Sequence, residues 1–296
     1  MAIKKITQAQ NFLSAHAQLF SCPLCHQEMM ATDSGLRCPE GHQFDLSKKG
    51  TLYFLQHQIK TEYATEMLAA RGRMIQRGIF NPVLDLIGQW LPTDSALTID
   101  VGCGEGGMLA YLADHGATGP KIGFDIAKDG IYLASQQATE DTFWCIADLT
   151  NLPFADHSAD TILNIFSPSH YGEFRRVLTP EGTFIKVIPA AHYLQELRQG
   201  LFAGETKANY SNEPVMNHLA EVATIIHQEA VNYRFSLADE SAFADLLQMS
   251  PLEWQANPEQ VQALKTAPFS RITIDLQVVE CRPKSSLPPA SQTSLN

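Results

Sequence analysis

Short apolar runs recur through the middle of the chain and alternate with stretches that have helical spacing. The first run lies at 97–101, and the next four fall within 121–127, 142–154, 159–168 and 173–189. A helical pattern begins near residue 107, directly after the first run. Strands that alternate with helices favour a parallel sheet with helices on both faces. We therefore expect an α/β protein with a doubly wound, mostly parallel sheet that binds ligands at the carboxyl ends of its strands.

Three further segments extend this pattern. Residues 61–78 have the periodicity of an amphipathic helix that carries three arginines. Residues 231–254 predict a strand, a turn and a helix, and 271–283 predict a last strand. We expect the late strands to close the sheet with an antiparallel edge.

The stretch CPLCHQEMMATDSGLRCPEGH, residues 22–42, has the spacing of a metal site. Cys22 and Cys25 form a C-x-x-C turn, and Cys38 and His42 form a second short knuckle. Four such ligands suit tetrahedral zinc, with no position left for a substrate. Hairpins of this size bury little surface, so metal binding would supply free energy of folding. The sequence predicts a structural zinc ribbon.

Two other interpretations of these cysteines remain open, as does the identity of the fourth ligand. A redox site would require C-x-x-C at the start of a helix, whereas this segment has turn residues. The thiols could also be unrelated, and His26 could replace His42 as a ligand. Cys103, Cys145 and Cys281 are expected to be buried thiols.

The stretch IDVGCGEG, which follows the first predicted strand, indicates a cofactor site. Gly102 and Gly104 allow a sharp turn and a close approach to a ligand. Asp100 and Glu105 would repel a pyrophosphate, which glycine loops of dinucleotide folds bind. They suit S-adenosylmethionine instead, because its amino group and its sulfonium are positively charged.

The next two strands add candidate cofactor contacts. Asp125 ends the second strand, where a carboxylate can accept hydrogen bonds from ribose hydroxyls. Asp148 and Leu149 follow the third strand and suit the adenine amino group and ring. An ordinary loop carboxylate is the alternative for Asp148.

Composition and charge limit the classes of function. The 296 residues are 45% hydrophobic and 18% charged, which is typical of a globular protein. We find no run long enough to span a membrane and no signal peptide, so we expect a cytoplasmic protein. The net charge is −11, yet residues 1–90 hold nine basic and seven acidic side chains. A basic front on an acidic body can bind RNA locally, although ordinary scatter of surface charge is an equal alternative.

The ribbon, the segments EMLAARGRMIQRGIFNP and IPAAHYLQELR, and the glycine loop together resemble the ribosomal RNA large-subunit guanine-N1 methyltransferases. Roughly residues 80–190 alone resemble class I S-adenosylmethionine-dependent methyltransferases. The family resemblance covers about residues 20–280, and it implies 21–60 as a zinc ribbon that docks RNA and 61–282 as the methyltransferase domain. Residues 1–20 and 283–296 lie outside this core, and we expect a flexible N-terminus and a flexible tail.

The resemblance also places cofactor contacts on Phe80, Gly104, Glu105 and His192. Phe80 could instead be a core residue. His192 could face solvent.

A target guanine must meet the cofactor near the end of the fourth strand. Asn164 and Ser167 are there, and we expect them to orient the base, although neither is a base catalyst. Phe166, Tyr171 and Tyr210 are candidates for stacking on it. The sequence indicates no residue as the acceptor of the guanine proton.

The expected function is methyl transfer to ring nitrogen 1 of a guanine in a hairpin of 23S ribosomal RNA. A methyltransferase for a small molecule, with a structural ribbon, is one alternative. A non-catalytic zinc-ribbon RNA-binding protein is another. The sequence leaves open which guanine is modified and whether two chains pair as a homodimer around one RNA.

Overall fold

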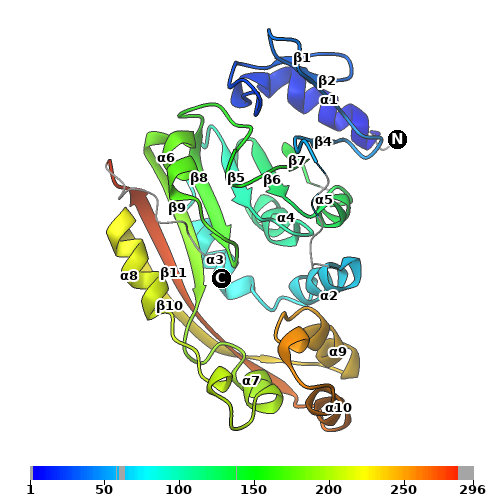
Figure 1. The fold of residues 1–296 in the computed structure, drawn as a ribbon, viewed down its shortest axis with the longest axis vertical. Coiled ribbons are helices and arrows are strands. Elements are labelled where there is room, and N and C mark those ends of the chain that lie inside the picture. The colour runs from blue at the N-terminus through cyan, green and yellow to red at the C-terminus, as the bar shows by residue number, and fades with distance from the viewer. Residues whose placement is uncertain (1–2, 58, 60–63, 138, 286–296) are drawn as a thin grey trace.

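Two sheets organise the protein, and the computed structural model describes residues 3–57, 59, 64–137 and 139–285. The small sheet has the order β1-β2-β3 and the large sheet has the order β10-β11-β9-β8-β5-β6-β7-β4. The small sheet consists of β1 (Met30–Ala31), β2 (Gly35–Arg37) and β3 (Gln43–Asp45). It lies at one end of the molecule, beside the first helix (Figure 1).

The large sheet is mostly parallel, as the alternation of strands and helices predicts. Its parallel strands are β4 (Thr51–Tyr53), β5 (Thr98–Val101), β6 (Lys121–Asp125), β7 (Thr142–Ile146), β8 (Ala159–Ile165) and β9 (Leu178–Pro189). Every residue of β5 is buried, and this strand pairs with both β6 and β8. The chain therefore reverses its direction of winding between β5 and β8, where doubly wound sheets bind ligands.

Helices connect these strands and cover the sheet. Those before and between the parallel strands are α1 (Lys5–His16), α2 (Thr65–Gln76), α3 (Asn81–Trp90), α4 (Gly107–Asp114), α5 (Lys128–Ala134) and α6 (Tyr171–Val177). Those after β9 are α7 (Gln195–Leu201), α8 (Glu213–Val222), α9 (Glu240–Gln248) and α10 (Pro258–Thr266). Short 3-10 turns occur at Ala17–Leu19, Thr206–Ala208 and Glu253–Gln255.

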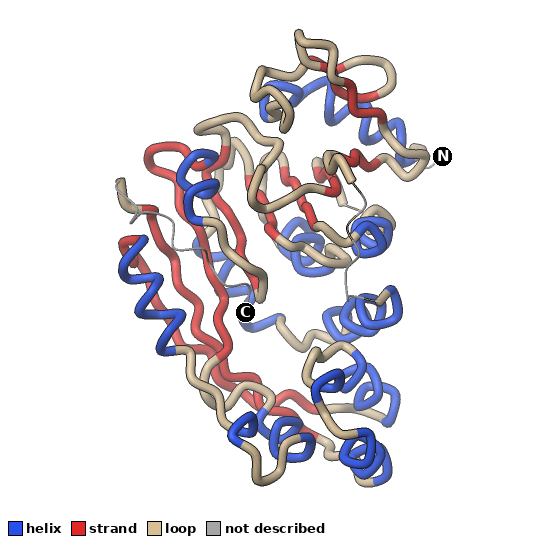
Figure 2. The backbone as a smooth tube through the Cα atoms, viewed as in Figure 1, coloured by secondary structure: helices blue, strands red, loops and turns tan. Residues whose placement is uncertain are grey.

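A long antiparallel pair, β10 (Ala223–Ser236) and β11 (Arg271–Pro283), completes the sheet. β11 also pairs with β9, but only from Leu276 to Cys281, so the first half of β11 extends beyond β9 with β10 alone. This arm carries α9 and α10 away from the central strands and toward α2 (Figures 1 and 2). The predicted antiparallel edge is confirmed.

The predicted flexible N-terminus, 1–20, is wrong for the residues that the structure describes. Residues 5–16 form α1, and Ala9, Phe12 and Leu13 are buried on one face of it. The ring of Phe12 stacks on Phe143 of β7, with ring centroids 5.3 Å apart. An apolar face on an otherwise polar segment therefore fixes this helix to the large sheet.

The range that we expected to be ribbon, 21–60, contains β4, a strand of the large sheet. β4 pairs in parallel with β7 and is the edge strand of the large sheet. At the other end of the chain, Pro283 ends β11 and Lys284 N donates to Val222 O. The rest of the predicted tail, 286–296, lies outside the described residues. Within the described ranges, no helix is long and apolar enough to cross a membrane.

Candidate functional site

The metal centre brings together the four ligands that the sequence indicates. The ligand atoms of Cys22, Cys25, Cys38 and His42 all lie within 4.8 Å of one another. Nδ1 of His42 is 3.5 Å from Sγ of Cys22 and 3.4 Å from Sγ of Cys38, and Sγ of Cys25 is 3.6 Å from Sγ of Cys38. A tetrahedron with zinc–sulfur bonds of about 2.3 Å has edges of roughly 3.7 Å. The donor set and its spacing therefore fit zinc.

Backbone hydrogen bonds shape the two metal-binding turns. His26 N donates to Cys22 O, and Gly41 N donates to Cys38 O. The His26 side chain is exposed and lies outside the cluster of four.

The three other cysteines are buried thiols, as expected. Cys103, Cys145 and Cys281 lie in the core, and burial raises the pKa of each thiol.

The glycine loop joins β5 to α4 and turns sharply. Gly102, Gly104 and Gly106 have φ angles of +66°, +57° and +78°. A Cβ on Gly102 would lie 2.7 Å from Cβ of Ser167, which is closer than two carbons can approach. Glycine at this position therefore lets the loop after β8 pack directly against the loop after β5.

Two buried carboxyl groups, of Asp100 and Glu105, and the half-buried one of Asp125 surround the glycine loop. Burial raises the pKa of Asp100 to about 8; Arg71 opposes this shift, and Glu105 and Asp125 add to it. Burial also raises the pKa of Glu105 and of Asp125.

Within the described residues, Oε2 of Glu105 is buried with no hydrogen-bond partner, and Nε of Arg71 is 3.9 Å away. An orphaned acidic oxygen among buried carboxyls fits a ligand that brings positive charge. The site therefore suits the ammonium and sulfonium groups of S-adenosylmethionine.

Helix α2 covers this loop. Cδ2 of Leu68 lies 3.7 Å from where a Cβ on Gly104 would stand, and a Cβ on Gly72 would lie 3.1 Å from Cγ of Glu105. The close packing of α2 keeps water from the acidic side chains beneath it.

The three arginines of the 61–78 segment are paired within the protein rather than free for RNA. Arg71 faces Glu105, and Arg77 lies 3.5 Å from Asp239. Arg73 makes a two-pronged contact with the buried Asp245 of α9, with its shortest distance 2.6 Å. These pairs connect α2 to the glycine loop on one side and to the β10–β11 arm on the other.

The carboxyl ends of β6 and β7 present the remaining predicted cofactor contacts. Asp125 accepts from Gly104 N at 2.9 Å and from Ala127 N at 2.7 Å, so it fixes the glycine loop. Oδ1 of Asp148 accepts from N and Oγ1 of Thr150, both at 2.8 Å. This is the arrangement of a turn carboxylate, and it leaves Oδ2 of Asp148 for a ligand. Leu149 is half-buried beside it.

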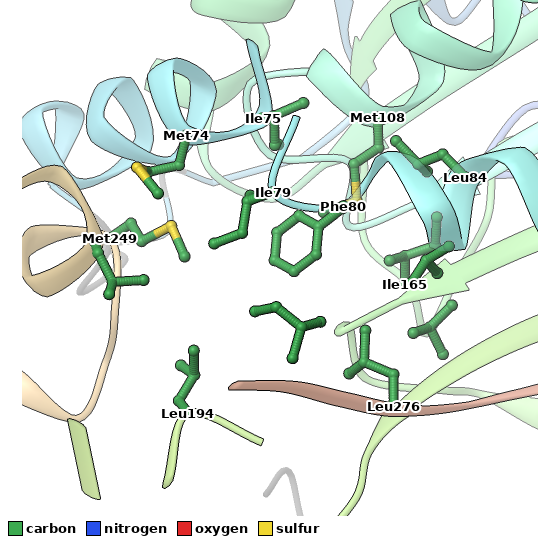
Figure 3. Packing of buried hydrophobic residues seen from close by; sticks show 14 of the residues in the cluster. Met74, Ile75, Ile79, Phe80, Leu84, Met108, Ile165, Leu194, Met249 and Leu276 are labelled. Atoms are coloured by element: carbon green, nitrogen blue, oxygen red, sulfur yellow. The ribbon is translucent and has the colours of Figure 1, made fainter. Parts of the chain in front are cut away.

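A pocket of about 380 Å³ lies on the other side of α2 and is rich in aromatic side chains. Phe80, Phe166 and Tyr193 line it together with Arg71 and Arg198. The ring centroid of Phe166 is 5.2 Å from that of Phe80 and 5.7 Å from that of Tyr193. Phe80 is 3% exposed and belongs to the core cluster drawn in Figure 3, so it is a core residue and also part of the pocket wall.

Asn164, which we expected to help orient the base, has its side-chain amide fully engaged within the protein. Its side chain is fully buried, and Nδ2 donates to the oxygens of Ser167 and Pro168 at 2.6 to 3.0 Å. Its Oδ1 accepts from Nζ of Lys186 at 2.5 Å and from Oγ of Ser169 at 2.7 Å. Both the nitrogen and the oxygen of the amide are bonded, to the loop after β8 and to Lys186 of β9, so Asn164 shapes the loop that presents Phe166.

Ser167 and Phe166 complete this loop. Oγ of Ser167 donates to Val101 O at 2.5 Å, which connects the loop to the end of β5 and leaves the serine little freedom to orient a base. Phe166 has a φ of +55°, an uncommon backbone conformation for a bulky residue. The hydrogen bonds of Asn164 and Ser167 hold the residues on both sides of it.

His192 has an exposed side chain and is not among the described residues that line the pocket, although Tyr193 and Leu194 are. Its backbone N donates to Asp275 of β11 at 2.8 Å. The helix that follows, α7, begins at Gln195, after Leu194 with its φ of +53°.

Of the other candidates for stacking, Tyr171 is buried against Phe174 and Phe184. Tyr210 packs on Arg198, with the guanidinium carbon 5.0 Å from the ring centroid.

Sequence reasoning missed Tyr193, Arg198 and Met249 as pocket residues. Tyr193 and Arg198 belong to the segment IPAAHYLQELR, which carries the resemblance, and that segment was the available signal for them. Met249 follows α9 and is brought to the pocket by the β10–β11 arm.

Comparison with known proteins agrees with this site. Residues 20–61 match the zinc-ribbon family described as RlmA, N-terminal, and residues 99–186 match a methyltransferase domain family. A Bacillus subtilis protein, YxjB, with a provisional description as a 23S rRNA (guanine-N(1)-)-methyltransferase, is 39% identical over 273 residues, covering 88% of this chain and 96% of its own. The 23S rRNA (guanine(748)-N(1))-methyltransferase of Streptomyces fradiae is 27% identical over 271 residues, with the same two coverages.

Among solved structures, an S-adenosylmethionine-dependent methyltransferase from Thiobacillus denitrificans, in complex with S-adenosylhomocysteine, has a TM-score of 0.43 at 15% identity. The similarity covers 77% of this chain and 95% of that one. One relative is 39% identical along nearly its whole length, and both a zinc ribbon and a methyltransferase domain match. The chain therefore belongs to the 23S rRNA (guanine-N(1)-)-methyltransferase family, enzymes that use S-adenosylmethionine and carry a zinc ribbon.

Proposed function

We propose that this protein transfers the methyl group of S-adenosylmethionine to ring nitrogen 1 of one guanine in a hairpin of 23S ribosomal RNA. The observation that carries the proposal is the aromatic pocket of Phe80, Phe166 and Tyr193, which Arg71 connects to the acidic glycine loop. A planar base between aromatic rings suits this pocket, and a base must leave its stack to enter it.

We further propose which residues hold the cofactor and the metal. The cofactor contacts are Phe80, Asp100, Gly102, Gly104, Glu105, Asp125, Asp148 and Leu149, with His192 retained on the resemblance alone. The zinc ligands are Cys22, Cys25, Cys38 and His42. Zinc is structural here because the protein supplies all four donors.

When bound, S-adenosylmethionine would supply the methyl group: its carbon–sulfur bond would break, leaving a neutral thioether, as ring nitrogen 1 of guanine gains the methyl group and loses its proton. Phe166 and Tyr193 position the base, and the apolar walls exclude water. The described residues that line the pocket include no carboxylate and no imidazole. We therefore expect the proton to pass to a water molecule at the mouth of the pocket, beyond its apolar walls, and not to a side chain of the pocket.

The RNA partner, the cytoplasmic location and pairing into a homodimer belong to the same proposal. Arginines 71, 73 and 77 are engaged in intramolecular pairs, so RNA contacts fall to other basic residues, such as Lys48 of the ribbon.

The test is methylation of unmodified 23S RNA fragments with radiolabelled S-adenosylmethionine, mapped by primer extension. The proposal expects one stop at a guanine within a hairpin. Phe166→Ala should lose activity, whereas Phe269→Ala, a matched change at an aromatic residue outside the pocket, should retain it. Cofactor binding without label in RNA would favour a small-molecule substrate and contradict the proposal.

A further inference from the structure

The first metal-binding turn of the ribbon is bonded to the turn that follows β7. Ser21 N donates to Pro153 O at 3.1 Å, and Nδ2 of Asn151 donates to Pro23 O at 2.9 Å. Pro23 lies between the zinc ligands Cys22 and Cys25. One hydrogen bond therefore joins the metal site to the turn that begins at Asp148.

A bridge between Phe20 and Phe154 reinforces this attachment, and Oγ of Ser21 donates to Phe154 O at 3.0 Å. Phe20 is fully buried and packs on Phe54, which follows β4. The ribbon is therefore attached to the carboxyl ends of β4 and β7 by backbone bonds and by core side chains.

These contacts enclose a second pocket, of about 310 Å³, at the same edge of the sheet. The residues that line it include Pro23 and Leu24 of the ribbon, Phe54 and Leu55 after β4, and Asp148 and Asn151 after β7. Leu24 is 40% exposed, although it is a large apolar side chain. A flat apolar ligand in this pocket would cover it.

The place of the pocket in the fold indicates which ligand it takes. Asp125, which we propose as the ribose contact, ends β6, and Asp148 lies past the end of the neighbouring β7. Adjacent strands are about 4.8 Å apart, so a base attached to that ribose reaches the end of β7. Oδ2 of Asp148 can accept a hydrogen bond from an amino group, and adenine carries one.

We propose that the zinc-binding turn at Pro23–Leu24 forms a wall of the adenine pocket, so that metal binding by the ribbon sets the affinity for the cofactor. The inference rests on the cofactor placement proposed above. The ribbon then has a second function besides docking RNA. It positions Leu24 in the pocket, and through the hydrogen bond of Asn151 it positions the turn that carries Asp148.

Calorimetric titration of the full-length zinc protein with S-adenosylhomocysteine tests this inference. Asn151→Ala removes the bond to Pro23 and should weaken binding about five- to tenfold. The matched control is Asn257→Ala, which removes an asparagine bond at the start of α10 and should leave binding unchanged. Leu24→Ala should weaken binding by about threefold to tenfold, whereas Met30→Ala, an exposed apolar residue of β1 outside the pocket, should not.

Chelation of zinc from the wild-type protein should lower the affinity for S-adenosylhomocysteine, and added zinc should restore it. Wild-type affinity in both Asn151→Ala and Leu24→Ala would overturn the inference and leave the proposed function intact. A loss of RNA affinity with unchanged cofactor affinity would also overturn it, because the pocket would then receive a nucleotide. Failure of the wild-type protein itself to bind S-adenosylhomocysteine would instead refute the cofactor placement.

Discussion

Gly102→Ala tests how closely the loops after β5 and β8 are packed. The added Cβ would stand 2.7 Å from Cβ of Ser167, and the residue has a φ of +66°. Gly104→Ala is the matched control, since φ is +57° there but the nearest atom, on Leu68, is 3.7 Å from the added carbon. Both variants place a side chain at a positive φ, but only in Gly102→Ala does the added Cβ overlap with another side chain, that of Ser167.

The magnitudes follow from these two contributions. A non-glycine residue in the left-handed region costs roughly 1–2 kcal/mol. Overpacking costs about 1–3 kcal/mol more. We expect Gly104→Ala to lose about 1–2 kcal/mol of unfolding free energy and Gly102→Ala about 2–5 kcal/mol.

Urea unfolding at fixed zinc concentration, followed by tryptophan fluorescence, measures both losses. Ser167→Gly removes the carbon that Gly102→Ala would meet. The double variant should therefore be more stable than the sum of the single variants, by about 1–3 kcal/mol.

Additivity of the two changes within about 0.5 kcal/mol would refute the reasoning. Equal losses in Gly102→Ala and Gly104→Ala would refute it as well. The two glycines should also differ in function: Gly104→Ala should weaken S-adenosylhomocysteine binding in protein that is still folded, because we propose Gly104 as a close cofactor contact.

Three other changes test further parts of the structure. Arg73→Ala leaves the buried Asp245 without its partner and should lower the free energy of unfolding in urea by about 2–3 kcal/mol. Arg77→Ala, whose partner Asp239 is more exposed, should lower it by under about 1 kcal/mol. Equal losses in the two variants would contradict this account. Asn164→Ala should displace the loop that carries Phe166, and it should therefore lower kcat by roughly tenfold or more. The affinity for S-adenosylhomocysteine should change little. An equal loss of kcat and of this affinity would indicate a cofactor contact instead. Burial raises the pKa of Asp100 to about 8, so the folded protein keeps a proton that the unfolded chain releases above about pH 4. Without cofactor, stability should therefore fall from about pH 4 to pH 8, and Asp100→Asn should flatten the fall in urea unfolding measured across that range.

The parts of the site that were predictable from sequence are those whose residues are close together in the chain. The zinc ligands lie in two short turns. Asp100 lies near the end of one buried strand, and Gly102 and Glu105 lie in the loop directly after it. Local spacing determines such geometry, because a turn or a strand end places neighbouring side chains without help from the rest of the fold.

The parts that were missed depend on long-range packing. Helix α1 has few apolar residues, and its buried face is evident only against β7. β4 is three residues long and gains its strand conformation from a partner far along the chain. Asn164 was placed at the right loop, but its hydrogen bonds to Lys186 and Ser169 depend on β9 and on the fold of the loop itself.

The pairing of β4 with β7 has a consequence for the order in which the protein folds. During synthesis the zinc-binding turns leave the ribosome first and can capture metal at once. Residues 51–53, however, must wait unpaired until 142–146 have been made. The early intermediate therefore has a metal-loaded N-terminal segment whose apolar face, including Phe12 and Phe20, still lacks its partner. Exposed apolar surface in such an intermediate is a target for chaperones until 142–146 have been made and β7 packs against it.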